Sequence, residues 1–181
     1  MQFTWALNAH DFGCTDTKAN NYNHRAIEND GSCQYNETFN TPKKLTDLNN
    51  IVSETSGIMV YNGLIWTNND SGGEAALYAV DPMSGGVLKK VIINGVSAID
   101  WEDLAIDEEF VYIGDFGNNN GNRKDLRIIK FPLSELDQDT VYSVSVMTFK
   151  YEDQTDFTSE PQATNYDAES LMVLGDSLFV F

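Results

Sequence analysis

Carboxylate side chains gather in four short segments of this sequence, and their spacing could support metal chemistry. The segments are residues 69–73, 100–103, 114–119 and 166–169. Calcium is a hard cation that takes about six to eight oxygen ligands, so a cluster of carboxylates suits it. The sequence therefore predicts a calcium site with ligands drawn from Asp70, Asp100, Glu102, Asp103, Asp115, Asp167 and Glu169.

The same segments are also ordinary turn sequences, because Asp and Asn cap turns and Gly tolerates positive φ. Glu102 and Glu169 are harder to explain in this way, since they stand at the start of equivalent predicted strands. A carboxylate at the edge of a core needs a partner, and Arg123 could supply one through a bidentate pair. A cationic or polyhydroxylated ligand would also suit these acids.

No catalytic constellation accompanies the acidic segments. Both histidines, His10 and His24, lie in the polar N-terminal segment, which argues against a zinc site. Ser71 has no histidine nearby to activate it, and the chain contains neither a P-loop nor a Gly-x-Ser-x-Gly motif. We therefore predict no catalytic residue, and the sequence signals favour a protein that is not an enzyme.

Strand signals dominate from residue 51 onward. Two β-rich runs, residues 58–61 and 64–67, flank Asn62-Gly63, which favours a hairpin with a type I′ turn. Further strands are predicted over Ala76–Val80 and Val87–Ile93. Four antiparallel strands in about 40 residues are typical of one blade of a β-propeller.

The strand pattern then recurs. Residues 56–60 align with 102–106 and with 169–173, at offsets of 46 and 113 residues. The second set continues with strands over Leu126–Phe131 and Val141–Tyr151, and residues 152–165 indicate an insertion. No long helix is indicated, because only Ser134–Leu136 could form a single turn.

We expect an all-β fold, a partial β-propeller of about two and a half four-stranded blades. The blades cover residues 51–95, 100–151 and 167–181, and the last is incomplete because the sequence stops in mid-strand. In such a blade the acidic segments fall at one end of the sheet, so they should converge on one rim. Trp66 and Trp101 are predicted to pack in the core.

Residues 1–36 form a different kind of segment, which contains the only two cysteines of the chain. Its part from residue 13 to residue 36 has almost no apolar side chains. The even count and close spacing of Cys14 and Cys33 predict one disulfide, and hence an oxidising compartment. That bridge would close a loop of about 20 residues and contribute about 3 kcal/mol. Residues 37–50 are polar, contain Pro42 and are predicted to be a linker.

The chain is strongly acidic, with 11 basic and 28 acidic residues and a net charge of −17. A polyanion of this size repels nucleic acid and anionic lipid, so neither is expected as a partner. No apolar run is long enough to span a membrane, and no signal peptide is visible at the N-terminus.

Two resemblances extend these expectations. The pattern Gly-Cys-Thr-Asp to Asp-Gly-Ser-Cys, residues 13–33, resembles a short repeat of secreted and surface bacterial proteins that is loosely similar to the thrombospondin type 3 calcium repeat. It implies calcium ligands at Asp16 and Asp30, although the regular Asp ladder of the type 3 repeat is absent; the alternative is a disulfide-stapled spacer.

Residues 51–181 resemble a family of bacterial secreted propeller proteins, distantly similar to esterase-like phytases. The acidic segments, in their order, together with Arg123, carry this second resemblance. It implies a propeller of about six blades at the cell surface or outside the cell. We expect a binding or adhesion module with structural calcium, whose ligand is a small molecule, a glycan or a protein. The alternative is a calcium-dependent phosphoesterase, although the segment offers few basic residues for phosphate.

Overall fold

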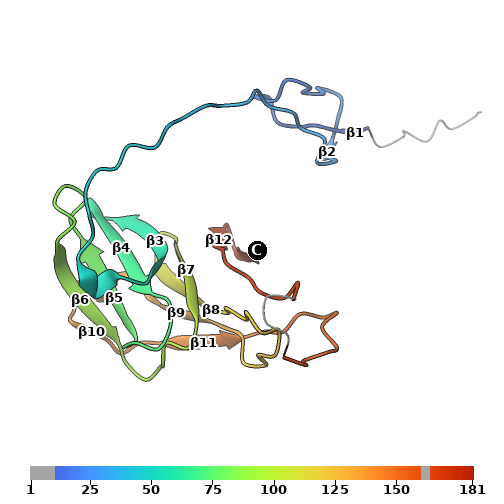
Figure 1. The fold of residues 1–181 in the computed structure, drawn as a ribbon. Coiled ribbons are helices and arrows are strands. Elements are labelled where there is room, and N and C mark those ends of the chain that lie inside the picture. Colours follow the sequence, from blue (N-terminus) through green and yellow to red (C-terminus); the bar gives the residue numbers. More distant parts are fainter. Residues whose placement is uncertain (1–10, 160–163) are drawn as a thin grey trace, which may run out of the picture. The chain divides into compact units, whose positions relative to one another are not determined.

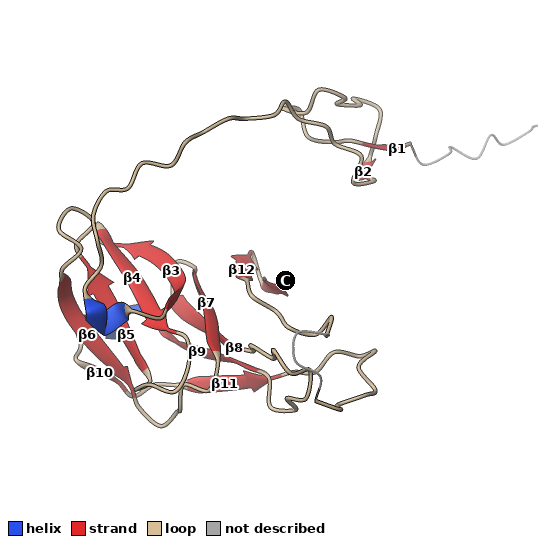
Figure 2. Ribbon diagram, in the orientation of Figure 1, coloured by secondary structure: helices blue, strands red, loops and turns tan. Residues whose placement is uncertain are grey.

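The computed structural model describes residues 11–159 and 164–181 (Figure 1). Contacts divide the chain into two units, Met1–Lys43 and Lys44–Phe181. The described helical residues form two short 3-10 turns, η1 (Asn50–Val52) and η2 (Leu133–Asp137), and the remaining regular structure is strand (Figure 2). The expectation of an all-β fold is confirmed. Within the described residues, no helix has the length and apolar character needed to cross a membrane.

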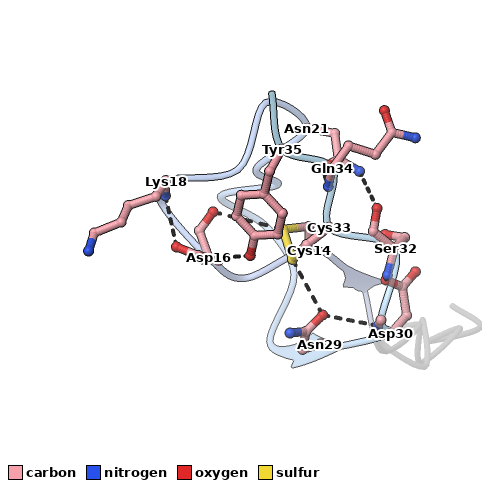
Figure 3. Close-up of a disulfide and its surroundings, with 11 residues drawn as sticks. Cys14, Asp16, Lys18, Asn21, Asn29, Asp30, Ser32, Cys33, Gln34 and Tyr35 are labelled. Atoms are coloured by element: carbon pink, nitrogen blue, oxygen red, sulfur yellow. Dashed lines mark hydrogen bonds between the residues drawn. A yellow bond between two sulfur atoms is a disulfide. The ribbon is translucent and has the colours of Figure 1, made fainter. Parts of the chain in front are cut away.

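The first unit is held by the predicted disulfide between Cys14 and Cys33 (Figure 3). Its regular structure is one short parallel pair, β1 (Phe12–Gly13) with β2 (Glu28–Asn29). The polar loop between the cysteines is ordered by hydrogen bonds, such as the one that the amide of Gln34 donates to Oδ1 of Asn21 at 2.7 Å. A segment with few apolar residues is thus stabilised by a covalent bridge and local turns.

The first sheet of the second unit contains the predicted hairpin. Strands β3 (Thr55–Tyr61) and β4 (Leu64–Asn69) are joined by Asn62 and Gly63, whose φ angles of 51° and 75° are those a type I′ turn requires. Strands β5 (Ala76–Val80) and β6 (Val87–Ile93) follow in antiparallel order, as predicted.

The second sheet contains strands β7 (Trp101–Ile106), β8 (Phe110–Asp115), β9 (Arg127–Pro132) and β11 (Ser145–Thr148). The prediction of one long fourth strand over Val141–Tyr151 is wrong. Its first part, β10 (Thr140–Val141), pairs in parallel with β6 and gives the first sheet a fifth strand. The physical reason is burial, because η2 returns the chain to the first sheet and Val141 becomes fully buried beside Ile93.

A third, two-stranded sheet consists of β12 (Leu171–Leu174) and β13 (Ser177–Val180). All three leading hairpins have the same register. The cross-strand pair Met59–Trp66 in the first corresponds to Ala105–Tyr112 and to Met172–Phe179 in the others, at the offsets found in the sequence. Strand β7 contacts both β3 and β12, so the leading strands of the three sheets are neighbours (Figure 1).

The main core lies between the first two sheets. Trp66 and Trp101 belong to it and are 4% and 0% exposed, so their predicted place in the core is confirmed. A second core, with Tyr112, Phe116 and Leu171, lies between the second sheet and the β12–β13 hairpin. These two cores fix the ends of β4 and β7, where the acidic residues stand.

Candidate metal centre

Three of the predicted ligands meet where the first two sheets adjoin. Asp70, Asp100 and Glu102 each offer a carboxylate oxygen, and these oxygens lie within 4.8 Å of one another. Asp70 directly follows β4, Asp100 directly precedes β7, and Glu102 lies in β7. A β-bridge between Ser71 and Asp100, and the 2.9 Å hydrogen bond that the Trp101 amide donates to the Asp70 carbonyl, join the two segments.

The burial of this triad is uneven. Glu102 is 8% exposed, whereas Asp70 and Asp100 are half-buried. The hydroxyl group of Ser56 lies 3.4 Å from Oε2 of Glu102. Oδ1 of Asp70 is buried and has no hydrogen-bond partner. A buried carboxylate oxygen without a donor loses solvation and gains nothing in return, so the position favours a cation or a proton.

Gly117 provides the space that the triad occupies. A Cβ atom at this position would overlap Oε1 of Glu102 and lie 2.5 Å from Oδ2 of Asp100. The Gly117 amide also donates a 3.3 Å hydrogen bond to the Asp100 carbonyl. Its backbone does not need positive φ, so glycine is required here by the close approach of two carboxylates.

The carboxylates around Glu102 and Asp100 raise the pKa values of these two groups, and Arg123 opposes this effect at Asp100 only in part. Burial raises the pKa of Glu102 to about 8, and the charges of Glu169, Asp70 and Asp100 act in the same direction. Burial and the nearby carboxyl group of Asp70 raise the pKa of Asp100 to about 6, against the opposing effect of Arg123. No ion pair among the described residues involves Asp70, Asp100 or Glu102.

Asp115, another predicted ligand, is used differently. Its carboxylate is fully buried and lies 2.9 Å from the Arg123 guanidinium and 2.7 Å from that of Arg127. Its Oδ1 also accepts a 3.2 Å hydrogen bond from the Asp100 amide. Arg123, which we expected to pair with Glu102 or Glu169, instead binds Asp115. Both oxygens of Asp115 are thus occupied by cations, and the ion pair supports the loop that carries Asp100.

Three further predicted ligands link the third sheet to the second. Oδ2 of Asp103 accepts a 2.8 Å hydrogen bond from the Leu171 amide, and Oδ1 of Asp167 accepts one of 2.6 Å from the Asn118 amide. Glu169 is exposed, and its negative charge acts to raise the pKa of Glu102. None of these three belongs to the close group of ligands, although the charges of Asp167 and Glu169 act to raise the pKa of Asp100 and of Glu102, respectively.

The two predicted calcium ligands of the first unit, Asp16 and Asp30, accept hydrogen bonds within that unit (Figure 3). Asp16 accepts hydrogen bonds from the Tyr35 hydroxyl at 2.6 Å and the Lys18 amide at 2.8 Å, and these bonds lower its pKa. Asp30 accepts a 2.9 Å hydrogen bond from the Ser32 amide, and its pKa is also lowered. Neither belongs to a group of three close metal-ligating side chains in the described part of the chain.

An open groove of about 860 Å³ lies at the opposite end of β7, between the second sheet and the β12–β13 hairpin. Some of its polar groups have partners within the groove. The Tyr112 hydroxyl donates a 2.7 Å hydrogen bond to Asp107, and Nζ of Lys130 lies 3.6 Å from the centroid of the Phe110 ring. Its lining also includes Glu108, Glu109 and Asp176, which form no ion pair among the described residues. Unlike the triad, these acids do not belong to a close group of three metal-ligating side chains in the described part of the chain.

Sequence reasoning missed two residues that shape the site. Gly117 stands in an Asp-x-Gly segment that reads as an ordinary turn, and nothing local signals its closeness to the triad. Arg127 could have been found from strand register, because it faces Asp115 directly across β8 and β9.

A search of protein-family models gives no match to the chain, and a search of curated proteins gives none either. The functional argument therefore depends on the site itself.

Proposed function

We propose that the second unit is part of a secreted or cell-surface β-propeller that acts as a binding module, and that Asp70, Asp100 and Glu102 hold a structural calcium ion in it. The observation that carries this proposal is the triad, whose close carboxylates form no ion pair with a described cationic side chain. Like charges in a half-buried site are costly unless a cation or protons neutralise them.

The architecture supports the propeller part of the proposal. Three hairpins share one register, and their leading strands are neighbours, as the inner strands of successive blades would be. The Cys14–Cys33 disulfide supports an oxidising compartment, such as the space outside the cell.

Calcium is the cation that best fits the donor set. All the charged donors are carboxylate oxygens, which hard cations prefer, and no histidine or cysteine joins them in the described residues. Calcium accepts irregular geometry and mono- or bidentate carboxylates, whereas magnesium demands a near-ideal octahedron. The ligands come from two different chain segments, so an ion here would join the first sheet to the second.

The alternative function, calcium-dependent hydrolysis of a phosphate ester, has less support. Such chemistry needs cationic side chains that can reach the phosphate next to the metal. The arginines nearest the triad, Arg123 and Arg127, are both bound to Asp115 and are 13% and 18% exposed. A binding role does not require them to be free.

Calcium titration by calorimetry, together with thermal unfolding in calcium and in EDTA, tests the proposal. At a calcium concentration of about 100 times Kd, the free energy of unfolding should rise by about 2.7 kcal/mol. For a unit of this size the melting temperature should then rise by about 8 °C. Asp70→Asn should remove most of that shift, whereas Asp153→Asn, in an exposed loop, should keep it.

The result that opposes the proposal is an identical melting temperature in calcium and in EDTA. Calcium-dependent turnover of a phosphate ester, lost in Asp100→Asn, would favour the hydrolase instead.

A further inference from the structure

The three leading hairpins present the same two kinds of face. Their shared register places Trp66, Tyr112 and Phe179 at equivalent positions, and we define the side of each sheet that carries this residue as its aromatic face. Side chains alternate between the two sides of a strand, so the neighbouring residues form the opposite side, which we define as the aliphatic face. Its first two members in the successive hairpins are Ile58 and Val60, Leu104 and Ile106, and Leu171 and Val173.

The two junctions between the sheets are built in the same way. In the main core, the aromatic face of the first sheet, with Trp66, meets the aliphatic face of the second, with Leu104. In the second core, the aromatic face of the second sheet, with Tyr112, meets the aliphatic face of the third, with Leu171. Each junction therefore joins an aromatic face to the aliphatic face of the next sheet.

The aromatic face of the third hairpin has no such neighbour in the described part of the chain. Met172 and Phe179 pair across β12 and β13, and Leu174 and Phe181 lie two residues further along each strand on the same side. All four side chains are between 40% and 70% exposed on the order of their residue area, and none belongs to a hydrophobic core of the described residues. A contiguous group of large exposed apolar side chains marks an interaction surface.

The aliphatic face of the first sheet is covered at its outer strands and open at β3. Val52 of η1 packs against Tyr78 of β5 on this face. Ile58 and Val60 of β3 are exposed, and neither belongs to a hydrophobic core of the described residues. Leu104, the equivalent of Ile58 in the second sheet, is buried in the main core. The first sheet thus lacks the aromatic neighbour that the second and third sheets have.

We propose that two copies of this chain pair head to tail, with the aromatic face of the third hairpin of each copy packed on the aliphatic face of the first sheet of the other. Each copy carries both halves of the junction, so a second copy supplies the matching face at both places. The three sheets of the second unit give six sheets in the pair, and propellers close with about four to eight blades. Two identical head-to-tail contacts can therefore close the pair into a ring. The closure rests on the propeller part of the proposed function, but the pairing does not depend on the calcium site.

The net charge of the chain gives the pairing a distinct salt dependence. Each copy carries a charge of −17, so two copies repel each other at low ionic strength. Salt screens this repulsion, because the Debye length falls from about 10 Å at 0.1 M to about 3 Å at 1 M. The faces that meet are apolar, so the attraction between them is not screened. We therefore expect the pair to become tighter as the salt concentration rises.

Sedimentation velocity on the full chain, in a dilution series, tests the inference. We expect the wild type to change from a monomer to a dimer as its concentration rises. Val60→Lys and Phe179→Glu each place a charge in both contacts, and each should raise the Kd of the pair at least about a hundredfold. Met83 is exposed in the turn between β5 and β6, so Met83→Lys and Met83→Glu add the same charges away from both faces and should leave the Kd unchanged.

The two variants also test the head-to-tail geometry. In an equimolar mixture of Val60→Lys and Phe179→Glu, a mixed pair has one intact contact and brings the two introduced charges, of opposite sign, into the other. The mixture should therefore pair more tightly than either variant alone. Both substitutions replace exposed side chains, so thermal unfolding of the dilute variants should match that of the dilute wild type and show that they fold.

The inference is wrong if the wild type stays monomeric throughout the dilution series, or if Phe179→Glu pairs as tightly as the wild type. Oligomers that keep growing beyond a dimer would overturn the closed pair. Calorimetry with calcium on the same samples separates this inference from the proposed function. A monomeric wild type that binds calcium would overturn the pairing and leave the calcium site standing, whereas a dimer that binds no calcium would support the pairing and overturn the calcium site.

Discussion

Replacing Asp115 by asparagine should destabilise the second unit by about 3–5 kcal/mol, because the change removes the one buried counter-charge that two guanidinium groups share. The Asp115 side chain is 0% exposed, and those of Arg123 and Arg127 are 13% and 18% exposed. Asparagine has nearly the same shape, so the loss reports charge and hydrogen bonding instead of a cavity.

Asp125 provides the matched control for this change. It also pairs with Arg123, at 3.1 Å, but its side chain is 59% exposed. Ion pairs in water contribute about 1 kcal/mol or less, so Asp125→Asn should have a small effect. The two substitutions remove the same charge from the same arginine and differ mainly in burial.

Urea unfolding in EDTA, followed by the fluorescence of the buried Trp66 and Trp101, measures both variants. With a slope of about 2 kcal/mol per molar urea, the midpoint should fall by about 2 M for Asp115→Asn and by less than about 0.5 M for Asp125→Asn. Equal midpoints for the two variants would refute the view that Asp115 is a buried structural ion pair, and would return it to the set of metal ligands.

Two further predictions concern the triad. In EDTA the folded chain should lose stability as pH rises from about 6 to about 8, by at most about 1.4 kcal/mol per pH unit. The reason is that the pKa of Glu102 is raised from 4.5 to about 8 in the folded chain. In this pH range the folded chain therefore keeps a proton that the unfolded chain has released. Urea midpoints measured across this pH range should fall less steeply for the wild type in calcium, and for Glu102→Gln in EDTA, than for the wild type in EDTA. An equal pH dependence in these three samples would contradict the prediction. Gly117→Ala should weaken calcium binding, measured by calorimetry, at least about tenfold, because the added Cβ overlaps the site. Gly73→Ala, with open space around it, should leave the affinity unchanged. Equal calcium affinities of the two variants would argue against a metal site beside Gly117.

The parts of the fold that depend on neighbouring residues could be predicted from the sequence. The hairpin at Asn62-Gly63 is one such part, because positive φ at two adjacent positions is a local requirement that these residues meet. The strands over Ala76–Val80 and Val87–Ile93 followed from local β propensity. The disulfide followed from the presence of only two cysteines, Cys14 and Cys33.

Long-range packing sets which acids stay unpaired. Asp115 and Glu102 have similar local sequence signals, yet one binds two arginines in a fully buried ion pair and the other has no cationic partner. Arg123 could have reached either carboxylate by sequence distance. Its choice depends on how the loop after β8 folds back, which is a matter of long-range packing.

The place of Val141 has the same kind of cause. Local propensity predicts that Val141 belongs to a strand of the second sheet. In the structure Val141 is instead fully buried beside Ile93 and pairs with the first sheet. Strand propensity is a property of a few adjacent residues, whereas pairing and burial depend on surfaces supplied by distant segments. Local strand and turn signals are thus enough to place carboxylates at the ends of strands. The packing of the sheets brings Asp70, Asp100 and Glu102 together without an ion pair to any of them among the described residues, because only packing sets which charges are buried together.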